Sequence, residues 1–142
     1  MYKQDEKFGQ MRWISTDRKG GGYFECRSRF QPTGHMLDIA VDAPADGPTV
    51  AQRNFYKDIE TNYSWLVGVM QPLIEAEFRN WQPGFAIQDF SAELWPVGLD
   101  IPQLIDNKPV KWELSFETAH DLNHMVTVLY QNFQPYAVRV DG

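Results

Sequence analysis

The sequence contains a single cysteine, Cys26, among 142 residues. One thiol cannot form an intramolecular disulfide, and it cannot supply a thiolate metal cluster. No stretch approaches the roughly 20 apolar residues that a membrane-spanning helix requires. The first seven residues are mostly charged or polar and lack the apolar core of a secretory signal. These absences predict a cytoplasmic protein without a membrane span.

Positive charge is scarce beyond the first 30 residues. The formal net charge is −6, but residues 1–30 carry seven Lys or Arg against four Asp or Glu, a net +3, whereas the remainder carries six against fifteen, a net −9. Nucleic-acid binding needs Lys and Arg to neutralise phosphates, so the acidic body disfavours it. The same charge permits a basic protein partner, although charge that only keeps the protein soluble is the simpler interpretation.

Hydrophobic residues, by contrast, are plentiful, at 43% of the chain, with 14% aromatic. Disordered chains are poor in such residues. A chain of 142 residues is also long enough to build one core without disulfides. We therefore expect a single domain over residues 1–142, and we allow for disorder in residues 1–9.

Two patterns of hydrophobic spacing divide the chain. Alternation with a period of two, which is typical of strands, lies on both sides of a helical segment at 49–81. The segments predicted as strands are 10–16, 23–30, 35–42, 85–94, 110–117, 124–130 and 136–140, with 95–101 more irregular. Strands on both sides of a helix indicate an α+β fold. We expect an antiparallel sheet of about six or seven strands in the order βββ-α-ββββ.

The helical segment begins with Thr49 and Gln52, which have the spacing of a capping box. Its apolar positions follow in steps of three or four residues: Phe55, Ile59, Tyr63, Leu66, Met70, Ile74, Phe78 and Trp81. Pro72 removes a backbone hydrogen bond and crowds the preceding turn. The sequence therefore predicts a long helix that is kinked near 68–72, or two abutting helices with Pro72 in the first turn of the second.

No set of residues demands a particular chemistry. His120 and His124, with Glu117 nearby, are the best metal candidate, but a hairpin loop does not aim both imidazoles at one point. Cys26 is expected to be a small buried residue rather than a nucleophile. Glu113 and Glu117 lie roughly 13 Å apart at about 3.3 Å per residue, which is too far for a glycosidase pair. We predict no catalytic residue, no metal site and no cofactor.

Two parts of the chain carry a family resemblance. One is Pro48-Thr49-Val50-Ala51-Gln52, followed by Phe55-Tyr56 and the long helix. The other is the strand 112–116 together with 124–128 and the closing Val140-Asp141-Gly142. Together they resemble small bacterial domains of unknown function, some of which are encoded near polymorphic or contact-dependent toxins as suspected immunity proteins. The resemblance implies a role in binding and supplies no catalytic residue.

The charge asymmetry and the lack of a catalytic set favour a non-enzymatic protein-binding domain, such as an immunity-type inhibitor that caps a bacterial toxin. The residues predicted for its acidic, aromatic-containing surface are Trp95, Asp100, Asp106, Glu113, Glu117 and Asp121. Two alternatives stay open. One is a small-ligand binder or enzyme with a pocket between helix and sheet near Trp81, Trp95 and Tyr130. The other is a structural subunit that forms a homodimer through an open sheet edge.

Overall fold

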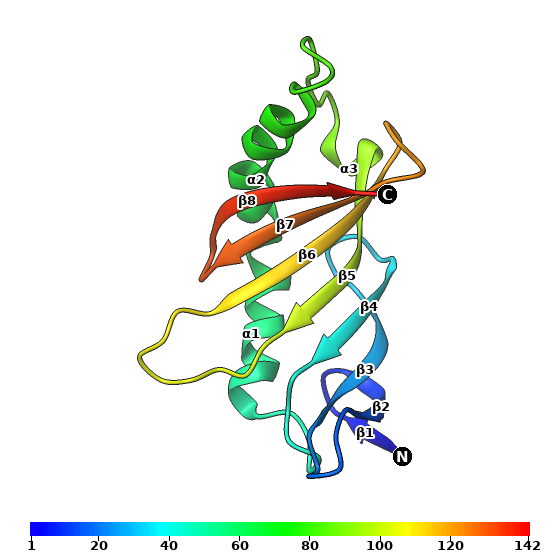
Figure 1. The fold of residues 1–142 in the computed structure, drawn as a ribbon, viewed down its shortest axis with the longest axis vertical. Helices are drawn as coiled ribbons and strands as arrows, with labels where there is room; N and C mark the ends of the chain where they lie inside the picture. Colours follow the sequence, from blue (N-terminus) through cyan, green and yellow to red (C-terminus); the bar gives the residue numbers. More distant parts are fainter.

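Alternating apolar and polar residues form eight strands, which make one open sheet in sequence order in the computed structural model of residues 1–142 (Figure 1). The strands are β1 (Tyr2–Asp5), β2 (Gly9–Ser15), β3 (Gly22–Arg29), β4 (Met36–Val41), β5 (Leu94–Ile101), β6 (Lys111–Thr118), β7 (Met125–Gln131) and β8 (Gln134–Asp141). All neighbouring pairs are antiparallel except β4 and β5. The α+β class is as predicted. The predicted antiparallel sheet is confirmed except for the parallel β4–β5 pair, and the order is ββββ-α-ββββ, with β1 as the additional strand.

The helices α1 (Val50–Thr61), α2 (Tyr63–Phe78) and α3 (Phe90–Glu93) all lie between β4 and β5 in the sequence. Two parallel neighbours need a crossover connection over one face of the sheet. Here α1 and α2 supply it and lie end to end across that face (Figure 1). The apolar stripe of the helices and the inward side chains of the strands then form one continuous hydrophobic core.

Two strand predictions differ from the structure. Residues 85–89 are irregular and lead into α3, and the strand begins only at Leu94 and continues through Pro96. The pairing of β5 with β6 shifts register between Pro96 and Gly98. A proline fits there because a bulge needs no regular ladder hydrogen bond. Residues 2–5, for which the sequence allowed disorder, form β1.

The helical segment consists of two abutting helices, which was one of the two predicted alternatives. The helices do not divide near Pro72 as predicted. The capping box is confirmed, because Thr49 Oγ1 accepts a hydrogen bond from the Gln52 backbone N–H at 3.1 Å and the Gln52 side chain accepts one from Thr49. The division falls at Asn62, whose side chain donates to the Asp58 carbonyl at 2.8 Å. Pro72 instead lies inside α2.

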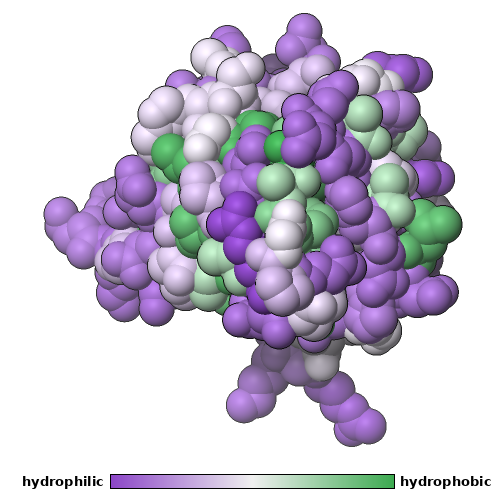
Figure 2. Space-filling view, turned by 90° about the horizontal axis from the view of Figure 1, so that it is seen from above, coloured by the Kyte–Doolittle hydropathy of each residue, from purple (hydrophilic) through white to green (hydrophobic).

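The surface at the end of the molecule that carries the α2–α3 connection is largely hydrophilic, with small separate hydrophobic areas (Figure 2). None of the helices combines the length and the apolar character needed to cross a membrane. Contiguous apolar surface is the usual sign of an apolar docking face. This end of the molecule therefore does not have the character of one.

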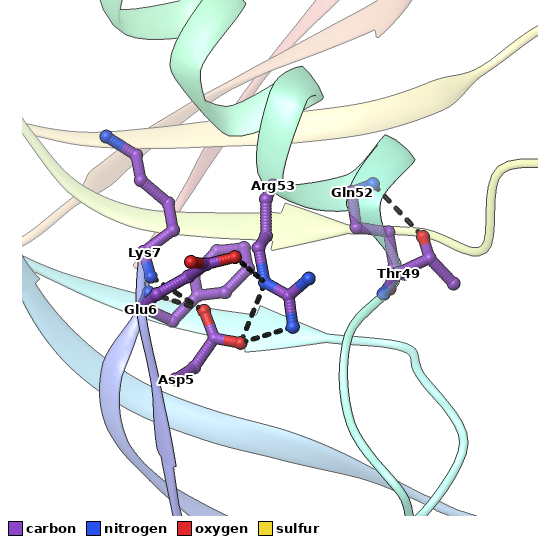
Figure 3. Close-up of polar contacts among 7 residues, drawn as sticks. Asp5, Glu6, Lys7, Thr49, Gln52 and Arg53 are labelled. Atoms are coloured by element: carbon purple, nitrogen blue, oxygen red, sulfur yellow. Dashed lines mark hydrogen bonds and ion pairs between the residues drawn. The ribbon is translucent and has the colours of Figure 1, made fainter.

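A buried carboxylate fixes the turn between β1 and β2 to α1 (Figure 3). Asp5 accepts hydrogen bonds from the backbone N–H groups of Lys7 and Phe8, both at 2.9 Å, and from Arg53 Nε at 2.9 Å and Nη2 at 2.8 Å. Burial raises the pKa of Asp5, but the Arg53 and backbone hydrogen bonds outweigh burial and hold the pKa below its ordinary value of 3.8. The ionised carboxylate is therefore a structural element of this turn.

The same turn makes a second ion pair with α1, between Lys7 and Glu60. Glu60 also accepts a hydrogen bond from the Gln31 backbone N–H at 2.9 Å, so it joins α1 to the end of β3 as well. Phe8 stacks on Tyr56 with ring centroids 5.3 Å apart. Polar and aromatic contacts thus attach the amino-terminal hairpin to the helical layer.

We predict that Asp5→Asn lowers the free energy of unfolding by about 2 kcal/mol, because it leaves the Arg53 guanidinium without its buried partner. Urea unfolding at pH 7 measures the change. Asp38→Asn is the matched control, because the Arg27–Asp38 pair is exposed and is expected to contribute less than about 1 kcal/mol. Equal losses in the two variants would contradict the structural role of Asp5.

We also predict a pH dependence for this contribution. Because the pKa of Asp5 is lower in the folded than in the unfolded protein, its stabilisation is present above the ordinary value of 3.8 and is lost as the pH falls through the folded-state pKa. The stability difference between the wild type and Asp5→Asn should therefore shrink below about pH 4. A difference that stays constant from pH 7 to below pH 3 would be incompatible with this pKa shift.

Candidate functional site on the open sheet face

The face of the sheet opposite α1 and α2 bears the outward side chains of every strand and is hollowed at its centre. The hollow has a volume of ≈670 Å³. The strand register places Ala40, Gly98 and Ser115 on three successive strands, so small residues form its floor. Tyr2 and Tyr23 line it from the amino-terminal half of the sheet. We call this concavity the open-face hollow.

Arginines on this face lie beside carboxylates. The pairs are Arg12–Glu25 at 3.7 Å, Arg27–Asp38 at 3.1 Å, and Arg139–Glu113 at 3.6 Å. All three are exposed, so each adds little to stability. Each of these three arginines therefore already has a carboxylate partner on the same face.

One carboxylate of the open-face hollow has no cation of its own. Asp100 lies directly across from Glu113 in the β5–β6 pairing, and like charges in that position repel. The side chain is open to solvent, yet the walls of the hollow remove part of its hydration. This desolvation, followed by the charge of Glu113, raises the pKa of Asp100 above its ordinary value. An ammonium or guanidinium group placed between the two carboxylates would relieve both effects.

The structure gathers four of the six residues predicted for the acidic surface on this face. Asp100 and Glu113 are cross-strand neighbours, as are Trp95 and Glu117. The indole N–H of Trp95 donates to Glu117 Oε2 at 3.2 Å.

The other two predicted residues lie in loops at opposite ends of β6 (Figure 1). Asp106 is in the β5–β6 loop, and Asp121 is in the β6–β7 loop, where it contacts His124 Nδ1 at 2.5 Å. The hydrogen bond from His124 holds the pKa of Asp121 below its ordinary value. The structure therefore does not place these two residues beside Asp100 and Glu113.

Sequence reasoning missed the contribution of the first half of the chain to this face. Arg12, Tyr23, Glu25 and Arg27 all line the open-face hollow. Alternation along the second predicted strand, 23–30, already assigns Tyr23, Glu25 and Arg27 to the outward side. What the alternation lacks is the order of the strands, and only that order puts these residues across the hollow from Asp100.

The other candidate chemistries have ordinary structural explanations. Cys26 is buried, and burial, followed by the nearby charges of Asp5 and Asp38, raises its pKa to about 12, which leaves the thiol protonated. His120 Nε2 contacts Glu93 Oε1 at 2.5 Å, whereas His124 contacts Asp121. The two histidines therefore have separate carboxylate partners, and no group of three or more His, Cys, Asp or Glu side chains is arranged to hold a metal ion.

The alternative pocket near Trp81, Trp95 and Tyr130 is not one cavity. Trp81 is half exposed in the connection after α2, and Tyr130 is fully buried and stacked on Trp112 with centroids 4.3 Å apart. Trp95 lines a hollow at the start of β5, and neither Trp81 nor Tyr130 lines that hollow.

No family model matches the chain, and comparisons with curated proteins and with solved structures find no match. Function is therefore inferred from the geometry of this chain.

We predict that Asp100→Asn leaves the protein as stable as the wild type or more stable, by up to about 1 kcal/mol at pH 7, because it removes the repulsion from Glu113. Urea unfolding checks this. Asp106→Asn in the β5–β6 loop is the control and should change stability by less than about 0.5 kcal/mol. A clear loss of stability in Asp100→Asn would show that Asp100 has a favourable partner in the folded protein.

Proposed function

We propose that this chain is a non-enzymatic protein-binding domain whose open sheet face receives a basic segment of another protein. The observation that carries the proposal is the Asp100–Glu113 pair, two facing carboxylates in the open-face hollow, of which only Glu113 lies beside an arginine. A lysine or arginine from a partner would supply the missing counter-charge. Charge-assisted hydrogen bonds of this kind are among the stronger polar contacts.

The shape of the face supports binding of a macromolecule. The hollow is broad, and strands β1 to β6 all contribute to it. Its wall includes the aromatic rings of Tyr2 and Tyr23, and aromatic residues are enriched at the centres of protein interfaces. The existing arginine–carboxylate pairs would sit at the polar rim, where they favour correct orientation more than affinity.

An immunity-type inhibitor is the form of this function that we favour. Toxins that act on nucleic acids present basic substrate grooves, since phosphate binding requires Lys and Arg. A concave acidic face would cover such a groove and be drawn to it by long-range attraction. The bacterial-immunity resemblance of the sequence points the same way.

The decisive experiment compares charge reversals on and off the face. Wild-type protein, Asp100→Lys and Asp106→Lys are immobilised in equal amounts, and proteins captured from cells of the native source are quantified at low salt. We expect a basic partner on the wild type and on Asp106→Lys, and at least tenfold less on Asp100→Lys, which corresponds to about 1.4 kcal/mol or more. Raising the salt should release it.

Thermal unfolding of each variant verifies that the domain stays folded. The proposal fails if the captured protein binds all three proteins equally, or if the loop variant loses as much binding as the face variant. It also fails if the captured partner carries no basic surface.

A further inference from the structure

The sheet is interrupted between its two central strands. β4 and β5 pair only from Asp38–Gly98 to Val41–Ile101. β5 begins four residues earlier, at Leu94, and extends beyond the start of β4 (Figure 1). Residues 94–97 therefore have β6 on one side and no strand on the other.

A second hollow occupies this gap. It has a volume of ≈560 Å³ and lies between the β3–β4 turn, the first turns of α2, and α3 with the start of β5. That volume is within the range of roughly 300–1,000 Å³ that is typical of small-molecule sites. We call it the β4–β5 hollow, and it is separate from the open-face hollow, with which it shares no lining residue.

Three aromatic side chains line the β4–β5 hollow, and each is held in place by a neighbour. Trp95 is oriented by its hydrogen bond to Glu117. Phe90 meets Phe116 edge to face with centroids 5.8 Å apart, and Tyr63 meets Phe30 edge to face at 5.1 Å. Rings that are already fixed lose little conformational entropy when a ligand binds, so they suit a flat apolar body.

Asp89 is the only carboxylate that lines this hollow, and neither Lys nor Arg lines it. The imidazole of His35 is the one basic side chain in the lining. One oxygen of Asp89 accepts a hydrogen bond from the Ser91 hydroxyl at 3.0 Å, which leaves the second oxygen for a ligand. A positively charged ligand group would gain from Asp89 and from the faces of the aromatic rings, whereas a ligand carboxylate would be repelled.

We propose that the β4–β5 hollow binds a small molecule with a flat aromatic body and a positively charged amine, with the amine on Asp89 and the ring among Tyr63, Phe90 and Trp95. This site shares no lining residue with the open-face hollow, although Trp95 belongs to the same face of the sheet. Loss of protein binding and loss of small-molecule binding can therefore be measured separately.

The test uses three arylalkylamines, tryptamine, tyramine and phenethylamine, with indole-3-propionate and tryptophol as the acidic and neutral counterparts of the first. Binding to the ¹⁵N-labelled protein is followed by amide chemical shifts at pH 8. We expect tryptamine to shift amides of residues 32–35, 63–67 and 89–95, and to bind at least fivefold more tightly than indole-3-propionate. Asp89→Asn should weaken the binding of tryptamine at least fivefold and leave the affinity for tryptophol unchanged.

Two further variants distinguish the site from general attraction of amines to an acidic protein. Ser64→Trp fills the hollow from an exposed helical position and should abolish binding, whereas Thr61→Trp, which does not line the hollow, should not. Asp100→Asn removes the carboxylate pair of the other face and should leave tryptamine binding intact. The proposal is overturned if none of the three amines binds at millimolar concentration, or if indole-3-propionate binds as tightly as tryptamine. It is also overturned if Asp100→Asn weakens tryptamine binding and Asp89→Asn does not.

Discussion

The architecture depends on the parallel pairing of β4 with β5 at the centre of an otherwise antiparallel sheet. Antiparallel neighbours need only a short turn, but parallel neighbours need a crossover over one face. This connection places α1 and α2 on one side of the sheet, and no second crossover covers the other side (Figure 1). The open face and the gap beside the start of β5 both follow from that one pairing. They hold the two hollows from which the binding proposals are argued.

The two ends of the sheet are attached to the helical layer by different means. The carboxyl-terminal strands pack on α2 through partly buried apolar side chains such as Val138 and Val140. The amino-terminal hairpin relies on charge as well, because the buried Asp5 and the partly buried Glu60 both have cationic and backbone donors. Ion pairs of this kind demand a defined geometry. They fix where the first two strands lie, and hence the position of the Arg12 and Tyr2 wall of the open-face hollow.

The uneven distribution of charge along the sequence does not translate directly into unpaired charge on the folded surface. The excess of basic residues in residues 1–30 suggests a positive hairpin, yet Arg12 and Arg27 are paired with Glu25 and Asp38 on the strands themselves. The acidic residues of β5 and β6 are less completely compensated, because Arg139 reaches Glu113 and no cation reaches Asp100. The acidic excess on the open face is therefore concentrated on β5 and β6, and this local excess makes the open face a candidate for a basic partner.

Local spacing along the chain is enough to predict the fold class, the capping box at Thr49, the core face of the helices, and which side chains of most strands point outward. These properties depend on periodicity over a few residues, and the chain carries them locally. Local spacing does not predict that Pro96 lies in a strand, that the helices divide at Asn62, or that Asp100 faces Glu113. Those features depend on pairing between segments far apart in the sequence, where a bulge or a register is set by neighbouring strands. They are set when the strands assemble, because strand order and register determine which outward side chains meet.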